Sequence, residues 1–251
     1  IRFGEFPNAL KLSIITPVFK KGERDKMENH RPIVKLPVLS KVVEKIMKVQ
    51  ITEHFERYNL FSDRQFGFRG GRSTVDAILE LMDFVLEGFN SKQFCLTSFL
   101  DISKCFDCIS HDLLIDKLKN YDFRGGAISM MKSYLENRYQ AVSHLGSLSC
   151  YSLNNIGVPQ GSVIGPLIFL IFVNDLAFKF PEQVILFADD TSIISKKPSL
   201  SEVESSHNIL ENQISAWFKA NRLEINNSKT QHLLSSLKDT SLAKRPPNPP
   251  S

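Results

Sequence analysis

The chain has 251 residues, a formal net charge of +4 at pH 7 and four cysteines. This mildly basic balance permits a polyanionic partner without requiring one. Four cysteines are too few for a disulfide scaffold at this length, so we expect a reduced, intracellular chain. The longest apolar run, residues 163–173, contains Gly165 and Pro166 and is too short to span a bilayer, so we expect no membrane partner.

The first 37 residues are basic and interrupted by prolines, and residues 13–19 within them predict a β-strand. Two helices follow, each predicted from apolar residues at helical spacing. The stripes are Leu39, Val42, Val43, Ile46 and Val49, and then Val75, Ile78, Leu79, Met82 and Leu86. A Gly- and Arg-rich loop at residues 64–74 separates them, and Ser73 with Asp76 forms an N-cap pattern at its end.

The middle of the chain alternates between predicted strands and helices. In order, these are a buried strand at residues 94–101, helices at 110–119 and 127–137, one or two short strands within 140–153, and a loop at 157–162 leading into an apolar helix at 166–176.

Residues 184–194 predict a β-hairpin, because two apolar runs rich in β-formers flank Asp189 and Asp190. Hairpin turns usually require Gly or Asn-Gly, so an Asp-Asp pair indicates that the charge itself is needed. The alternative is a pair of solvated turn acids.

The last third of the chain predicts a helix and a weak strand. Ser201 and Glu204 form a capping-box pattern before a helix that carries Trp217. Leu223 and Ile225 alternate with polar residues, which favours a short strand, and residues 237–251 predict a disordered Pro-rich tail.

Asp101 closes one predicted strand and Asp189 closes another, so neighbouring strands of one sheet would bring these carboxylates together. Three acids in one place, with Asp190 as the third, repel one another unless cations lie among them. Two Mg²⁺ ions about 3.5–4 Å apart would relieve this repulsion and create a centre for phosphoryl transfer.

Other motifs leave alternatives open. Phe106, five residues beyond Asp101, could exclude a ribose 2′-hydroxyl or simply fill a core. The loop at 157–162 suits close approach to a base, or a turn before a helix. Cys105, Cys108 and His111 could supply three metal ligands, but no fourth ligand with zinc spacing lies nearby. The loop at 67–74 lacks the glycine spacing of a Walker loop, so an NTPase is excluded.

The order of these segments resembles the reverse transcriptase domain of non-LTR retrotransposons of the jockey and chicken-repeat groups. The matching blocks include Phe187-Ala188-Asp189-Asp190 and cover roughly residues 10–235. They are residues 15–22, 29–33, 65–74, 99–107, 157–166, 187–190 and 217–230.

The resemblance implies an RNA-directed DNA polymerase with two Mg²⁺ ions, for which Mn²⁺ could substitute. Asp101 and Asp189 are implied to be the main metal ligands, with Asp190 as the third acid and the Ile102 carbonyl as a backbone ligand. Lys229 resembles the lysine that protonates the pyrophosphate leaving group; a surface lysine is the alternative.

The implied partners are an RNA template, a DNA primer and a dNTP. Phe106 resembles the steric gate against ribonucleotides, and Gln160 and Gly161 resemble the loop that packs on the incoming nucleotide. The triphosphate would be held by Lys20 or Lys21 together with Arg31. Arg69 and Arg72 are expected to contact the template backbone.

The implied fold is a right-hand polymerase of α+β class, with a palm of antiparallel sheet backed by helices. Fingers are expected at residues 1–92 and 109–158, and palm at 93–108 and 159–236. The thumb is expected to be missing or truncated. The chain begins at Ile1, so a fragment is expected, with an endonuclease domain upstream in the full-length element and a nuclear site of action.

Two rival functions remain. The first is a catalytically inactive relic that at most binds nucleic acid. The intact acids argue against it, and the truncated ends argue for it. The second is a metal-dependent nuclease, which would not explain Phe106 or Gln160 and has no His or Glu base beside the hairpin.

Overall fold

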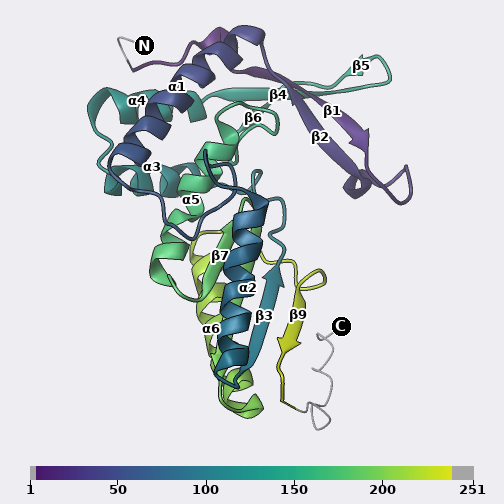
Figure 1. Ribbon diagram of the computed structural model, residues 1–251. Helices are drawn as coiled ribbons and strands as arrows, with labels where there is room; N and C mark the ends of the chain where they lie inside the picture. Colours follow the sequence, from purple (N-terminus) through teal and green to yellow (C-terminus); the bar gives the residue numbers. More distant parts are fainter. Residues whose placement is uncertain (1–3, 239–251) are drawn as a thin grey trace. The chain divides into compact units, whose positions relative to one another are not determined.

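The computed structural model describes residues 4–238, which fall into two compact units. Unit 1 comprises Ile1–Leu60 and Phe106–Phe172, and unit 2 comprises Phe61–Cys105 and Val173–Ser251. Both contain helices and strands, which confirms the predicted α+β class (Figure 1). The predicted fingers and palm bounds are not tested by this division and stay predictions. From residue 239 onward, the predicted tail lies outside the residues that the structure describes.

Unit 1 is built on a five-stranded sheet with the order β2-β1-β4-β5, and β6 also pairs with β4. β1 and β4 run parallel, and the other pairs are antiparallel. The strands are β1 (Leu12–Phe19), β2 (His30–Lys35), β4 (Arg138–His144), β5 (Ser147–Leu148) and β6 (Ser152–Asn154). β1 confirms the predicted strand at 13–19.

The sequence does not predict a strand at β2, because Pro32 is a residue that interrupts strands. β2 lies at the edge of the sheet, where a residue without an N–H is tolerated, and Pro32 lies opposite Pro17 of β1.

The helices of unit 1 pack around an aromatic core. Phe6 meets Tyr134 edge to face at 5.1 Å between ring centroids, and Phe55 is fully buried. The helices are α1 (Val38–Arg57), α3 (His111–Asn120), α4 (Gly125–Leu135) and α5 (Gly165–Lys179), of which α5 belongs to unit 1 up to Phe172; η1 (Asn8–Leu10) and η2 (Met27–Asn29) are short 3-10 turns.

Unit 2 contains an entirely antiparallel sheet with the order β7-β8-β3-β9. The strands are β3 (Phe94–Leu100), β7 (Val184–Phe187), β8 (Asp190–Lys197) and β9 (Gln231–Ser235). β7 and β8 confirm the predicted acidic hairpin. β9 replaces the strand expected at Leu223 and Ile225, where the structure has only an isolated bridge from Ile225 to Ile102.

Two helices, α2 (Thr74–Asn90) and α6 (Leu200–Ala220), cover opposite faces of this sheet (Figure 1). Cys95 of β3 contacts α2, where a Cβ on Gly88 would lie 2.1 Å from the Cys95 Sγ. Ser98, three residues further along β3, contacts α6 instead. Residues an odd number apart on a strand point to opposite faces, which is why one strand serves both helices.

The cap of α2 is confirmed and the cap of α6 is corrected. The Ser73 side chain accepts a hydrogen bond from the Asp76 N–H, and the Asp76 carboxylate accepts one from the Ser73 N–H. In α6 the capping box is Ser199 with Glu202, so the prediction of Ser201 with Glu204 was wrong. The sequence contains two overlapping Ser-x-x-Glu patterns, and Ser199 is the one with extended backbone before the first turn.

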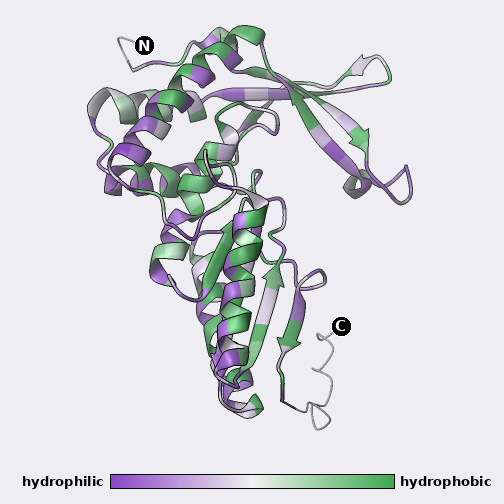
Figure 2. Cartoon of the chain, viewed as in Figure 1, coloured by the Kyte–Doolittle hydropathy of each residue, from purple (hydrophilic) through white to green (hydrophobic). Residues whose placement is uncertain are grey.

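The two predicted apolar stripes do form helices, but most of their side chains are exposed in the part of the chain that the structure describes. Figure 2 shows hydrophobic residues interspersed along both helices, α1 and α2. On α2 the stripe side chains are between 48 % and 61 % exposed. The buried face of α1 includes Glu44, whose carboxylate accepts hydrogen bonds from Ser40 Oγ and the Val163 N–H. No helix within the described residues is long and apolar enough to cross a membrane.

Candidate active site

Asp101 lies directly beyond the end of β3, and strand register determines its neighbours. In the pairing of β3 with β8, Leu100 lies opposite Thr191, so the next position sets Asp101 opposite Asp190. The pairing of β3 with β9 ends at Phe99 and Gln231, and the turn just before β9 brings Lys229 Nζ to 2.9 Å from Asp101 Oδ2. Opposite residues of antiparallel strands lie about 5 Å apart, so these side chains form one cluster.

Asp189 occupies the tight turn between β7 and β8, because Phe187 pairs directly with Asp190. The preceding turn residue, Ala188, has a φ of +57°, a conformation that costs energy for a residue with a side chain. The turn thus holds Asp189 and Asp190, both exposed, at the tip of a hairpin whose β7 residues are largely buried.

The carboxylates are close enough to affect one another. Partial burial of the Asp190 carboxyl group raises its pKa above the usual value. The negative charges of Asp189 and Asp101 raise this pKa further. Lys229 Nζ lies 2.9 Å from Asp101 Oδ2 and offsets part of the negative charge. Repelling carboxylates on rigid strands are hard oxygen ligands suited to divalent cations, so the residues present fit a metal centre.

Ile102 is buried and bridges to Ile225. The residues on either side bond to the same segment through their backbones: the Asp101 carbonyl accepts from the Asn226 N–H, and the Ser103 N–H donates to the Glu224 carbonyl. This antiparallel alternation directs the Ile102 carbonyl to the opposite side. Its role as a metal ligand stays a prediction.

The hairpin is supported by the segment that precedes α2. The Phe66 N–H donates to Leu186, and the Leu186 N–H donates to Arg64, so this segment runs along β7. Gly67 then passes so close that a Cβ on it would lie 2.0 Å from the Ala188 nitrogen. The sequence alone did not indicate this role for Gly67, although a glycine in an ordered loop is the signal for such an approach.

A groove of about 650 Å³ lies beside the carboxylates within unit 2. Its walls come from α2, β3, β7 and β8, and Asp101, Asp190 and Lys229 contribute to its lining. The groove joins charged groups to an apolar surface that includes Phe99 and Phe187.

Phe106, Gln160 and Gly161 belong to unit 1. Phe106 is half-buried, with its ring 5.2 Å from that of Phe169. The Gln160 amide donates to both carboxylate oxygens of Asp107, at 2.9 and 2.8 Å. The Gln160 carbonyl accepts from the Val34 N–H of β2. The loop is therefore fixed to the segment that carries Phe106, and the nucleotide contacts stay predictions.

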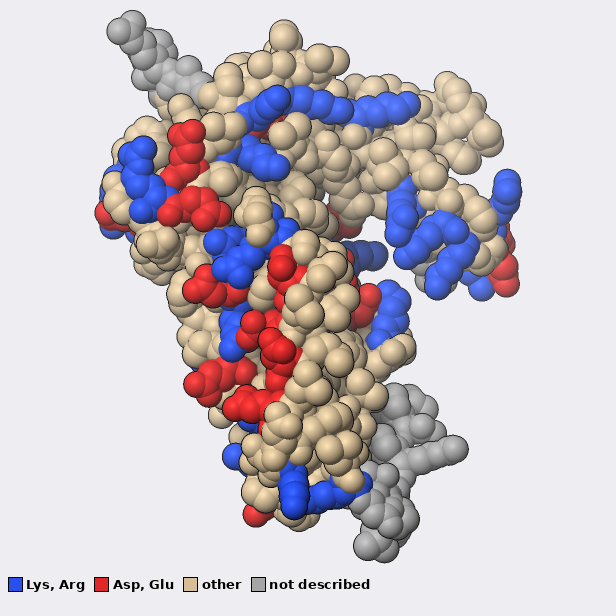
Figure 3. All heavy atoms as spheres, in the orientation of Figure 1, with Lys and Arg blue, Asp and Glu red and all other residues tan. Residues whose placement is uncertain are grey.

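Three exposed cations, Lys20, Lys21 and Arg31, lie at the end of the β1–β2 pair where the chain passes from one strand to the other. Figure 3 shows basic side chains gathered over this end of the two strands. Arg31 lies opposite Val18, and the Lys20 N–H donates to Asn29, so the hairpin carries its cations on ordered backbone. Such a group suits a polyphosphate.

Arg69 and Arg72 each have partners within unit 2. Arg69 donates to the Ser62 carbonyl at 2.8 Å, and Arg72 pairs with Asp63 at 2.9 Å. Both guanidinium groups also lie over phenylalanine rings. These contacts hold the loop, and contact of either arginine with a template stays a prediction.

Residues 18–245 match the family model described as reverse transcriptase (RNA-dependent DNA polymerase). The chain is 32 % identical over 250 residues to a probable RNA-directed DNA polymerase from transposon BS of Drosophila melanogaster, covering 96 % of this chain and 28 % of that protein. It is 30 % identical over 235 residues to the RNA-directed DNA polymerase from mobile element jockey of the same species, covering 90 % and 26 %.

Among solved structures, telomerase from Candida tropicalis in complex with a telomeric RNA fragment superimposes with a TM-score of 0.64 at 13 % identity. The match covers 91 % of this chain and 41 % of that one, and it shows a shared fold. The chain spans a little over a quarter of the length of the curated relatives named above.

Gly67→Ala tests the support of the hairpin. The added methyl group would collide with the backbone at Ala188, so we expect the free energy of unfolding to fall by about 1–3 kcal/mol. Gly70→Ala is the matched control, because a Cβ there meets nothing within 4 Å, and its change should stay within about 0.5 kcal/mol. Urea denaturation measures both, and equal losses in the two variants would contradict the close approach.

Proposed function

The chain belongs to the reverse transcriptase (RNA-dependent DNA polymerase) family, and on that basis we propose that it adds deoxynucleotides to a primer 3′-hydroxyl on an RNA template. Pyrophosphate is the second product. The reaction needs no covalent intermediate on the protein, so catalysis consists of positioning the reactants and stabilising charge.

The observation that supports this proposal most strongly is the strand register at Asp101. It sets Asp190 opposite Asp101, with Asp189 in the adjacent turn, and the turn before β9 brings Lys229 to the Asp101 carboxylate. This arrangement concentrates negative charge at the end of a rigid sheet and keeps one ammonium group beside it. We assign Lys229 the role of protonating the leaving pyrophosphate, since its Nζ lies 2.9 Å from Asp101 Oδ2.

Reverse transcriptases use divalent metal ions, and we propose two Mg²⁺ ions here, with Mn²⁺ as a substitute. Asp101, Asp189 and Asp190 would hold them, together with the Ile102 carbonyl. When bound, such ions lower the pKa of an attacking hydroxyl and stabilise charge on the transferring phosphorus.

Unit 1 would supply the nucleotide contacts. Lys20 or Lys21 and Arg31 would hold the triphosphate as point and forked donors. Phe106 would exclude the 2′-hydroxyl, and the loop at Gln160 and Gly161 would pack against the nucleotide.

The nucleic-acid partners would be an RNA template and a DNA primer. Arg69 and Arg72 would approach the template backbone by exchanging their present partners for phosphates. An endonuclease domain upstream and action in the nucleus, both implied by the family, complete the proposal.

Asp189→Asn tests the proposal by primer extension on poly(rA)/oligo(dT) with dTTP and Mg²⁺. Asparagine keeps the shape of the side chain and removes its charge. Loss of about 4 kcal/mol of transition-state stabilisation would lower the rate about a thousandfold. Asp83→Asn, at an exposed position of α2, is the matched control and should extend like the parent chain.

Three results would contradict the proposal. Equal extension by the parent and Asp189→Asn would remove the carboxylates from the chemistry. No extension by the parent, with or without template binding, would favour an inactive relic. Primer degradation without a requirement for dTTP would favour the nuclease.

Phe106→Val tests the assignment of the steric gate. Removing the ring should raise ribonucleotide incorporation by about ten- to a hundredfold while dTTP incorporation changes little. Phe106→Tyr retains the ring and should keep the parent's discrimination. The ratio of rUTP to dTTP incorporation is the measurement, and an unchanged ratio in Phe106→Val would reject the assignment.

A further inference from the structure

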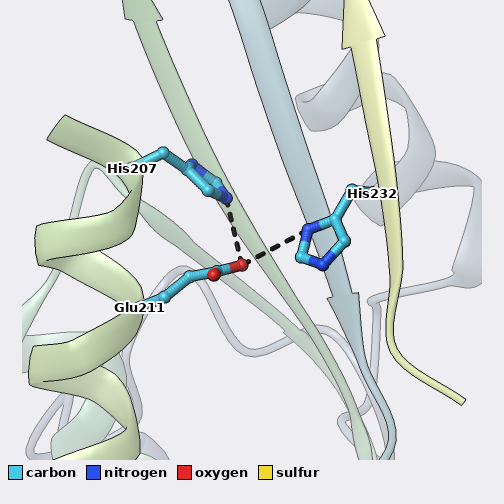
Figure 4. Close-up of side chains that lie close together, drawn as sticks. All are labelled: His207, Glu211 and His232. Atoms are coloured by element: carbon cyan, nitrogen blue, oxygen red, sulfur yellow. Dashed lines mark ion pairs between the residues drawn. The ribbon is translucent and has the colours of Figure 1, made fainter. Parts of the chain in front are cut away.

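A second cluster of metal-ligating side chains lies in unit 2, and none of the proposed polymerase roles uses it. His207, Glu211 and His232 converge so that one ligand atom from each lies within 4.8 Å of the others (Figure 4). Within the described residues 4–238, these three are the His, Cys, Asp or Glu side chains whose ligand atoms converge this closely.

Three secondary-structure elements bring these residues together. His207 and Glu211 are four apart on α6 and therefore project from one face of the helix. His232 lies on β9 directly opposite Ser98 of β3, so both of their side chains point to the same face of the sheet. That is the face covered by α6.

The distances suit a tetrahedral ion. His207 Nε2 and His232 Nδ1 each lie 3.4 Å from Glu211 Oε1. Ligands at 2.0–2.1 Å from a tetrahedral Zn²⁺ are separated by about 3.3 Å. Two imidazoles and one carboxylate are also a ligand set that zinc accepts, with the fourth position left for another oxygen.

The side chains around the ligands hold them in orientations suited to metal binding. His207 is 1 % exposed, and its Nδ1 lies 2.9 Å from Ser195 Oγ. When Nδ1 carries the proton and donates to Ser195, the lone pair of Nε2 is directed into the cluster, toward Ser98 Oγ, which is how outer-sphere hydrogen bonds orient ligating histidines.

The Ser98 hydroxyl lies at the centre of the cluster. Its oxygen is 2.6 Å from His207 Nε2 and 2.7 Å from His232 Nδ1, and it also hydrogen-bonds to Glu211. Without an ion, this hydroxyl keeps the three ligands close together. These distances are shorter than the roughly 3.3 Å that separates two ligands of a tetrahedral Zn²⁺, so the hydroxyl would shift outward when an ion enters, and its oxygen would then be available for the fourth position.

This cluster is separate from the carboxylates of the candidate active site. Ser98 and Asp101 are three residues apart, and side chains alternate along a strand, so Ser98 belongs to the α6 face and Asp101 to the α2 face. The chemistry differs as well, because imidazole nitrogens favour Zn²⁺ whereas an all-oxygen site favours Mg²⁺.

We propose that His207, Glu211 and His232 bind one Zn²⁺ ion, which fastens the edge strand β9 to α6. β9 begins two residues after Lys229, so the ion would also steady the segment that carries Lys229 beside Asp101. The role is structural, and the ion takes no part in nucleotide addition.

The test is zinc binding to the metal-stripped chain, measured by competition with a chromogenic chelator in excess Mg²⁺, which occupies the oxygen sites. We expect one Zn²⁺ per chain. His232→Gln and Glu211→Gln should each weaken binding at least tenfold, and His144→Gln, at an exposed position of β4, should leave it unchanged. Co²⁺ should give the strong visible absorption of a four-coordinate ion in the parent and not in His232→Gln.

Thermal unfolding provides an independent measurement. Zn²⁺ should raise the melting temperature of the parent and of His144→Gln, but not of His232→Gln, which should fold because its side chain is 41 % exposed. Absence of stoichiometric zinc binding by the parent would overturn the proposal and leave a hydrogen-bond network centred on Ser98. Binding that neither His232→Gln nor Glu211→Gln weakens would overturn it equally.

Discussion

The antiparallel pairing of β3 with β8 on one side and β9 on the other is the constraint on which the site depends. One step beyond the last pair of β3 and β8, this register sets Asp101 opposite Asp190, and the turn before β9 brings Lys229 to the Asp101 carboxylate. The hairpin turn adds Asp189, and the segment at Gly67 packs against that turn. The repulsion among the carboxylates is therefore imposed by backbone hydrogen bonds, and divalent cations are the physical means of relieving it.

β3 serves two different purposes on its two faces. Its α2 face leads to Asp101 and the groove beside it, where the available ligands are oxygens. Its α6 face carries Ser98 toward two imidazoles and a carboxylate. Side-chain alternation along one strand thus separates a surface suited to Mg²⁺ from one suited to Zn²⁺. β9 is connected to both surfaces, because it follows Lys229 in the chain and contains His232.

Local patterns predicted local features well. The alternation around Asp189 and Asp190 identified the hairpin, and Ser73 with Asp76 identified the start of α2. The features that the sequence did not predict depend on partners that are distant along the chain. β9 forms because β3 offers its backbone hydrogen-bonding partners. The residues of β9 do not by themselves show an alternating strand pattern. The zinc cluster joins residues from separate elements, and spacing along the chain reveals only the i, i+4 pair on α6. The exposed stripes of α1 and α2 show that apolar periodicity indicates a helix without indicating which face it buries.

The most direct test of the account is a count of bound Mn²⁺ by electron paramagnetic resonance, in the presence of primer–template and a non-hydrolysable dNTP. A His232→Gln background removes the contribution of the second cluster. Two ions per chain in that background, and loss of both in its Asp101→Asn, Asp189→Asn derivative, is the result that the account predicts. The same number and affinity of ions in both chains would contradict the claim that strand register assembles these carboxylates into the metal centre.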